Sequence, residues 1–273
     1  LSAAALTAVG VMPVGGLLFL ELGLQLLPSA ATTFAPMLLW VGATTSFLGG
    51  CMALVDRDLR ALLAGAALVH GGLALLGLSC LDTKAAVAAI LYLVSVSASL
   101  AVALFCVDAL ERRYLTRDSV ELFGVLEELP GLWRIVVLSF GSLLAVPMLG
   151  GGALAFEVAR GVLSTRAFAV AGLPSTLSFL VLLVSGLGAT LLAAGVVTVV
   201  RRLSSPHARP EVRTRAAFST SQSLRLWIAL VFVWSGSLLA PWLLPSLTEQ
   251  VERGTIAIEA GDRHVVAEPE ARR

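Results

Sequence analysis

The chain alternates long apolar stretches with short polar connections. Apolar stretches of membrane-spanning length lie near residues 3–27, 33–55, 60–80, 85–110, 175–200 and 224–246. About 30 Å of hydrocarbon is crossed by an α-helix of about 20 predominantly apolar residues. The pattern therefore predicts an all-α polytopic membrane protein.

One further apolar stretch, residues 131–165, is interrupted in its middle by Pro147, Gly150, Gly151 and Gly152. A helix break in lipid leaves backbone N–H and C=O groups without partners, unless protein or a water-filled cavity covers it. The stretch fits either one discontinuous span or two short spans joined by a tight turn. Broken helices with ionisable groups are typical of transporters, so we expect transport across a membrane.

The distribution of basic residues favours one discontinuous span. With seven spans, most loop arginines fall on one side of the membrane: Arg57, Arg60, Arg112, Arg113, Arg117, Arg134, Arg201, Arg202, Arg209, Arg213, Arg215 and Arg225. The opposite loops hold Lys84 and Arg166, besides the arginines of the tail. Because Lys and Arg concentrate in cytoplasmic loops, this one-sided distribution favours seven spans, with residues 131–165 as one of them. We expect a membrane domain over 1–246. The polar tail, residues 247–273, is then predicted to lie on the non-cytoplasmic side.

The composition excludes a soluble globular chain. Hydrophobic residues make up 58% and charged residues 14% of the sequence, and the mean hydropathy is +0.92. A net charge of +1 spread over short loops argues against a nucleic-acid partner. The three cysteines lack metal or redox spacing, so we expect no metal, cofactor or redox centre on this chain. Because the first residue is Leu1 rather than Met, we also expect a fragment with further spans upstream.

Several strings resemble the antiporter-like membrane subunits of respiratory complex I. DRDLRALLAGAALVHGGLALLG (56–77) is similar to the family's acidic residue, basic pair and His-x-Gly helix. LERRYLTRDSVELFGVLEELPGL (110–132) resembles the loop that leads to the broken helix, and PMLGGGALAFEV (147–158) resembles the family's glycine-rich core. These matches follow the family's order along nearly the whole chain. The pattern is closest to a divergent M-type subunit of NADH:quinone oxidoreductase, in its C-terminal half.

The resemblance implies a proton conduit that crosses the membrane through ionisable side chains and water. Glu157 falls on the glutamate of the family's broken helix, and His70 falls on a family histidine. Two structural interpretations compete. Glu157 lies three residues before Arg160 on one helix, where an ion pair forms readily, and His70 can simply hydrogen-bond to a neighbouring span.

Four further residues are secondary candidates for the pathway: Arg60, Glu21, Arg160 and Tyr92. Arg60 replaces a family lysine at a helix start, where it can serve as a cytoplasmic anchor or as a functional charge. Glu21 is either a substitute carrier or an exposed interfacial carboxylate. Tyr92, with the serines that follow it, can support a file of water, although serines in such helices commonly make packing contacts.

Two departures from the family pattern weaken the predicted conduit. A family lysine falls on Pro13 and a family histidine on Val96, and neither side chain can carry a proton. We expect an inner-membrane subunit that contacts lipid and other membrane-arm subunits and couples quinone reduction to proton transport. The alternatives are a subunit of a cation/proton antiporter or membrane-bound hydrogenase, a non-conducting structural paralogue, and an independent small-molecule carrier.

Overall fold

The structure is a computed structural model that describes residues 3–128, 130–144, 151–205, 231, 239 and 242–249. All the regular elements among these residues are helices, which confirms the predicted all-α fold. The described part has no strand, and its one isolated bridge pairs Asp58 with Asp118. The elements in chain order are α1 (Ala3–Leu18), η1 (Phe19–Leu26), α2 (Pro28–Val55), α3 (Leu59–Ser79), α4 (Thr83–Tyr114), η2 (Val125–Glu128), α5 (Pro130–Ser142), α6 (Gly152–Ser164), α7 (Ala167–Val170) and α8 (Thr176–Leu203).

Within the described residues, four helices are long and apolar enough to cross a membrane: Ser29–Val55, Leu59–Ser79, Thr83–Tyr114 and Thr176–Leu203. They coincide with the predicted spans 33–55, 60–80, 85–110 and 175–200, with boundaries that differ by no more than about four residues. The predicted span 3–27 corresponds to α1 followed by the π-helix η1. Most of the predicted span 224–246 and of the tail lies outside the described residues, so the count of seven spans stays a prediction.

The helix boundaries follow from capping side chains. Asp58 precedes α3 and its carboxylate accepts a hydrogen bond from the backbone N–H of Arg60 (2.7 Å). Asp82 does the same for the N–H of Lys84 at the start of α4 (3.2 Å). Such caps satisfy backbone donors that have no partner inside the helix. Two aspartates thus define where the third and fourth predicted spans begin.

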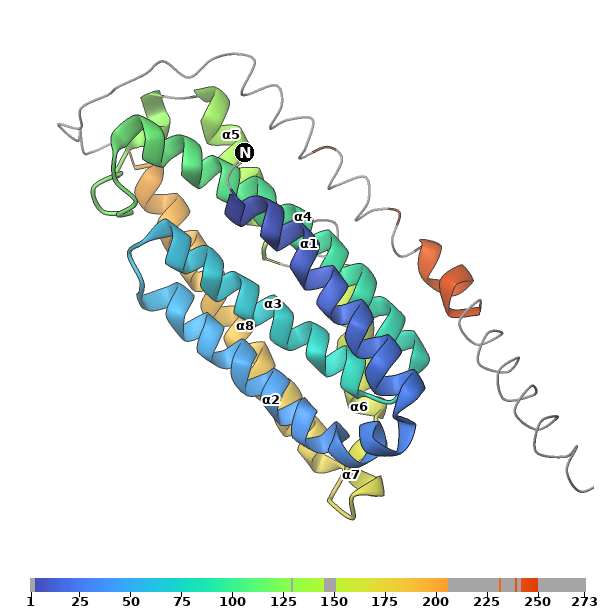
Figure 1. The fold of residues 1–273 in the computed structure, drawn as a ribbon. Helices are drawn as coiled ribbons and strands as arrows, with labels where there is room; N and C mark the ends of the chain where they lie inside the picture. The colour runs from blue at the N-terminus through green and yellow to red at the C-terminus, as the bar shows by residue number, and fades with distance from the viewer. Residues whose placement is uncertain are drawn as a thin grey trace, which may run out of the picture.

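The helices form an elongated bundle in which α3 is central (Figure 1). α2 and α8 pack together on one side of α3, and α4 packs on its other side with α1 alongside. α6 contacts α3, α4 and α8, so it closes the bundle behind the central helix. The predicted discontinuous segment, α5 and α6, therefore lies against the two helices that bear His70 and Tyr92.

Close backbone contact joins α2 to α8. A Cβ added to Gly50 would lie 2.2 Å from the carbonyl oxygen of Gly188, and one added to Gly188 would lie 2.4 Å from that of Ser46. No larger side chain fits without separating the helices. Small residues at such interfaces are the usual means by which helices associate in lipid, where the hydrophobic effect contributes little.

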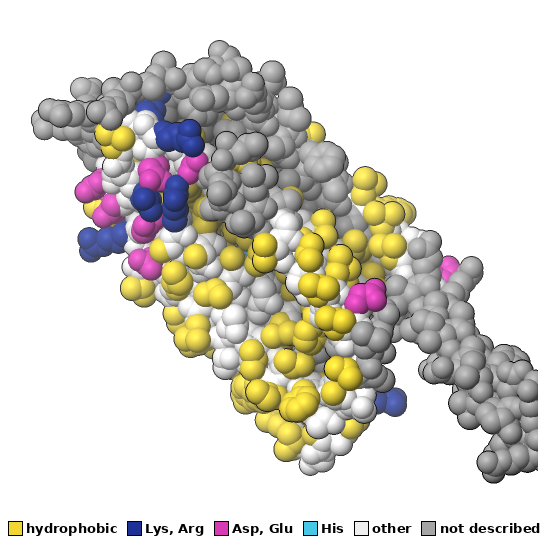
Figure 2. All heavy atoms as spheres, in the orientation of Figure 1, with side chains coloured by type: hydrophobic (Ala, Val, Ile, Leu, Met, Phe, Trp, Pro, Cys, Tyr) yellow, Lys and Arg dark blue, Asp and Glu magenta, His cyan; other side chains and the backbone are white. Residues whose placement is uncertain are grey.

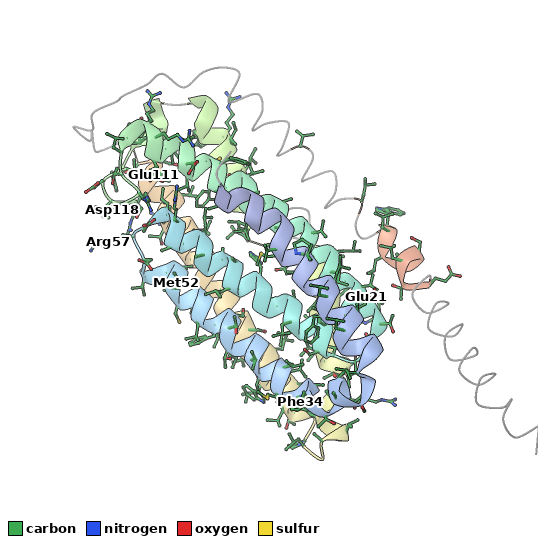
Figure 3. The ribbon with its side chains drawn as sticks, viewed as in Figure 1. Glu21, Phe34, Met52, Arg57, Glu111 and Asp118 are labelled. Carbon is green, nitrogen blue, oxygen red and sulfur yellow. The ribbon has the colours of Figure 1, made fainter. Side chains whose placement is uncertain are left out.

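Charged side chains gather at one end of the bundle (Figure 2). The labelled residues Arg57, Glu111 and Asp118 lie at this end, and Phe34 lies at the opposite end (Figure 3). The backbones of the two loops here are joined, because the Ser119 N–H donates to the Arg57 carbonyl (2.9 Å). This polar end connects α2, α3 and α4 outside the apolar middle of the bundle.

Candidate functional site

The predicted helix break falls between α5 and α6. α5 ends at Ser142, and α6 begins at Gly152 after Gly151, whose φ of 85° is incompatible with a right-handed helix. Pro147 and Gly150 lie outside the described residues. A Cβ on Gly151 would lie 3.2 Å from Tyr92 Cδ2 and 3.3 Å from Ser95 Oγ. The glycine therefore allows the start of α6 to approach α4 closely.

His70 and Tyr92 form a buried polar pair beside this break. His70 Nδ1 and the Tyr92 hydroxyl are 2.6 Å apart and hydrogen-bonded, and the tautomer of the imidazole decides which group donates. The rings meet edge to face, with centroids 5.7 Å apart. The Leu143 backbone, just beyond α5, also interacts with the imidazole, but no described group hydrogen-bonds to His70 Nε2. Within the described residues, one buried nitrogen of the pair therefore lacks a partner, as a site for water or a transferred proton would require.

The serines of α4 favour the structural interpretation. The Ser97 hydroxyl donates to the Val94 carbonyl (2.9 Å) and that of Ser99 to the Ser95 carbonyl (3.1 Å), both within the same helix. These hydroxyls are satisfied locally, so they need no water. Ser95 adjoins the described end of the helix break, because a Cβ added to Gly151 would lie 3.3 Å from its Oγ.

Glu157, in the middle of α6, lies at an ion-pair site beside the first turn of α4. Its Oε2 is 3.3 Å from Lys84 Nζ and 3.9 Å from Arg160 Nη1. The predicted pairing with Arg160 is therefore present, but Lys84 is the nearer cation. Lys84 was not among the predicted site residues, although it is the only lysine in the sequence. Its position at the first turn of α4, opposite a carboxylate some 70 residues later, depends on how α4 and α6 pack.

The two polar sites are separated along α4. Tyr92 follows Lys84 by eight positions on α4, which is about 12 Å of helical rise. Between them the backbone of Gly77 contacts both α4 and α6: a Cβ there would lie 2.7 Å from Ala89 Cβ and 2.9 Å from Val158 Cγ2. A proton cannot pass directly over this distance, and about three or four waters would be needed to bridge it.

The remaining candidates lie away from these two sites. Arg60 pairs with Asp108 (2.7 Å) and Glu111 (2.8 Å) at the polar end, where it holds α3 against α4. Glu21 is exposed on η1 (Figure 3), as the interfacial interpretation expects. Val96 is fully buried on α4, one turn beyond Tyr92, and Pro13 lies inside α1.

No three His, Cys, Asp or Glu side chains among the described residues are grouped as metal ligands would be. The described chemistry consists of the His70–Tyr92 pair, the Glu157–Lys84 pair and the Gly151 break between α5 and α6. Residues 1–181 match the protein family described as NADH:quinone oxidoreductase/Mrp antiporter, TM. The chain belongs to this family. The predicted resemblance to an M-type antiporter-like subunit is confirmed, and the chain is a multi-pass membrane protein.

The curated relatives of this chain include quinone oxidoreductase subunits. The chain is 24% identical over 192 residues to NAD(P)H-quinone oxidoreductase chain 4 2 of Thermosynechococcus vestitus, covering 70% of this chain and 35% of that protein. It is 26% identical over 131 residues to NADH-quinone oxidoreductase subunit M of Pseudomonas aeruginosa, covering 48% and 26%. The chain spans about a third to a half of the length of the first curated relatives that it matches.

The fold is also similar to a chain of respiratory complex I from Thermus thermophilus, solved with bound NADH. The TM-score is 0.71 at 20% sequence identity, and the match covers 89% of this chain and 51% of that one. At this identity the likeness shows the fold alone. The arrangement of α1 to α8 is thus shared with about half of that complex I chain.

Proposed function

We propose that this chain is part of a proton-translocating membrane-arm subunit in an NADH:quinone oxidoreductase-like complex. The observation that supports this most strongly is the buried His70–Tyr92 pair beside the Gly151 break, with Lys84 in the first turn of α4 paired to Glu157 of α6. Buried ionisable groups at a broken membrane helix are expensive and mark transport pathways. The coupling energy would come from quinone reduction elsewhere in the complex.

In this proposal a proton passes between two stations. Glu157 accepts a proton at the end of the bundle, and its neutral form releases Lys84 because the ion pair needs the carboxylate. His70 exchanges a proton at one nitrogen while the Tyr92 hydroxyl holds the other. Since Gly77, Ala89 and Val158 pack closely between the stations, this contact must open and admit water for each transfer.

Two residues that depart from the family pattern bear on the rival functions. Pro13 and Val96 stand where the family pattern has a lysine and a histidine, so the route beyond His70 relies on water alone. That departure favours a non-conducting structural paralogue as the second candidate. A subunit of a cation/proton antiporter is the third, because the matched family description includes Mrp antiporters.

The topology belongs to the same proposal. Seven spans, with residues 131–165 as one discontinuous span, place the tail after residue 246 on the non-cytoplasmic side of the inner membrane. Other membrane-arm subunits and lipid would surround the bundle. Quinone and nicotinamide chemistry would occur on other subunits, so this chain would hold no cofactor.

The test is the number of protons moved per electron in the assembled complex, reconstituted in sealed vesicles. Glu157→Gln keeps the size of the side chain and removes its proton exchange, so the ratio should fall while electron transfer continues. Glu121→Gln is the matched control, because Glu121 is exposed and bonds Thr116 at the polar end.

Each rival has its own outcome. A structural paralogue would assemble normally and keep its ratio in both variants. An antiporter subunit would show sodium-dependent proton movement without NADH oxidation.

A further inference from the structure

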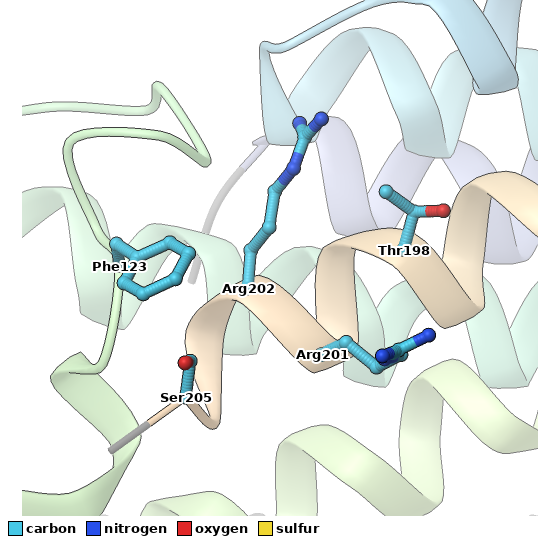
Figure 4. Close-up of a pocket in the computed structure, with 5 residues that line it drawn as sticks. All are labelled: Phe123, Thr198, Arg201, Arg202 and Ser205. Carbon is cyan, nitrogen blue, oxygen red and sulfur yellow. The ribbon is translucent and has the colours of Figure 1, made fainter. Parts of the chain in front are cut away.

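A pocket lies at the end of α8 (Figure 4), and none of its lining residues belongs to the two proposed proton stations. It has a volume of about 280 Å³ and is lined by Phe123, Thr198, Arg201, Arg202 and Ser205. Three of these residues come from the last two turns of α8, Ser205 lies just beyond the helix, and Phe123 comes from the segment before η2. The described lining residues are two cations, two hydroxyls and one aromatic ring, with no acid among them.

The two arginines are not neutralised by described acids. Arg202 donates to the Ser119 hydroxyl (3.3 Å), and Arg201 is exposed. Among the described residues, neither forms an ion pair, while the nearby acids Asp108 and Glu111 are bound by other arginines. Within the described part of the chain, the pocket therefore presents positive charge without an acidic partner, which suits an anion such as a phosphate group.

An exposed apolar stripe on α8 leads to this pocket. Exposed positions recur every three or four residues along the helix and end at Arg201: Leu183, Leu187, Thr190, Ala194, Val197, Thr198 and Arg201. Such spacing places these residues on one face. Because α8 is long and apolar enough to cross a membrane, this face provides an apolar surface along which acyl chains can lie, with cations at its end.

Aromatic contacts mark the same level of the bundle. The Trp133 indole N–H, on α5, donates to the Ser204 hydroxyl at the end of α8 (3.1 Å), and Trp133 is itself partly exposed. Tryptophan is enriched at membrane–water interfaces, where its ring lies at headgroup depth. The pocket thus lies where a phospholipid headgroup would be.

We infer that this pocket binds the phosphate of an anionic phospholipid, with the acyl chains along the exposed face of α8. Arg201 supplies the charge at the mouth of the pocket, while Ser205 and Thr198 can hydrogen-bond phosphate oxygens. Basic pockets at the membrane boundary are a known means of binding anionic headgroups. The inference does not depend on proton transfer, because none of these residues belongs to the His70 or Glu157 sites.

The experiment measures lipid retention by native mass spectrometry of the purified complex that contains the full chain. The probes are phosphatidylglycerol, phosphatidylcholine and inorganic phosphate. Phosphatidylglycerol should be retained in preference to phosphatidylcholine, and Arg201→Gln should weaken its retention about fivefold, as expected for one interfacial arginine. Arg201→Lys should restore part of the loss, and Ser205→Ala should cause a smaller loss than Arg201→Gln.

Arg166→Gln is the control, because Arg166 is an exposed arginine at the far end of α8, before α7. Equal retention in Arg201→Gln and the unchanged complex would overturn the inference, as would an equal loss in Arg166→Gln. Displacement of phosphatidylglycerol by millimolar inorganic phosphate would show a site for the free anion instead. Loss of a neighbouring subunit with lipid retention unchanged would show that the stripe is a protein interface.

Discussion

Removing the hydroxyl of Tyr92 tests the hydrogen bond between His70 and Tyr92 beside the helix break. His70 is 1% exposed and Tyr92 is fully buried, and their 2.6 Å hydrogen bond is the one that the structure gives to His70 Nδ1. Tyr92→Phe keeps the ring and leaves that nitrogen without its partner. A buried polar group left unsatisfied costs about 1–3 kcal/mol, so the free energy of unfolding should fall by that amount.

A double-mutant cycle isolates the contact itself. His70→Leu alone leaves the buried Tyr92 hydroxyl without its partner and should also cost about 1–3 kcal/mol. The double variant removes both polar groups, so its loss should be smaller than the sum of the two single losses by about 1–3 kcal/mol. Unfolding by SDS in mixed micelles, followed by the loss of helical circular dichroism, gives the three values. Losses that add to within about 0.5 kcal/mol would refute the pairing.

Three other results are expected. Gly188→Ala should destabilise the bundle by about 1–3 kcal/mol in the same SDS unfolding, because its Cβ would lie 2.4 Å from a backbone oxygen; Gly186→Ala on the same helix meets no atom within 4 Å and should be neutral or stabilising. Lys84→Met should change stability by less than about 1 kcal/mol, since the ion pair with Glu157 is partly exposed, but should alter proton movement measured in vesicles. Burial, with the nearby Asp82 carboxylate, raises the pKa of the Cys80 thiol to about 12, so on the order of one thiol in ten thousand is ionised at pH 8. Cys80 should therefore resist maleimide in the folded protein and react once SDS unfolds it. Rapid labelling of the folded protein would contradict its burial.

The raised pKa of Cys80 also gives a pH dependence with a definite sign. The folded thiol stays protonated until pH approaches 12, whereas an unfolded thiol ionises near pH 8.5. The contribution of this group to stability is therefore complete below about pH 8.5 and is lost progressively as pH rises from there towards 12. A Cys80→Ala variant should lose less stability than the parent chain over that alkaline range.

The spans were predictable because each is a long apolar segment bounded by local signals. Asp58 and Asp82 are helix caps, and the predicted spans 60–80 and 85–110 begin within three residues of them. The start of α6 after Gly151 was predictable for a similar reason, since glycine tolerates a positive φ that other residues avoid. These features depend on neighbours in sequence.

The contacts between helices were not predictable from the residues alone. Tyr92 and His70 are 22 residues apart, and Lys84 and Glu157 are 73 apart. Whether such residues meet depends on the rotation of each helix about its axis, which is decided by packing at positions such as Gly50 and Gly188. In the sequence Lys84 is an ordinary charge next to a loop, and only the packing of α6 against α4 brings Glu157 to it.

The most direct test of the proposed proton route compares His70→Leu, Glu157→Gln and their combination in the complex that contains this chain. The measured quantity is the number of protons moved per electron in sealed vesicles. Two stations in series predict that each single variant lowers the ratio and that the double variant is no worse than the more severe single one. A normal ratio in all three variants, or losses that simply add, would contradict a single route through both sites.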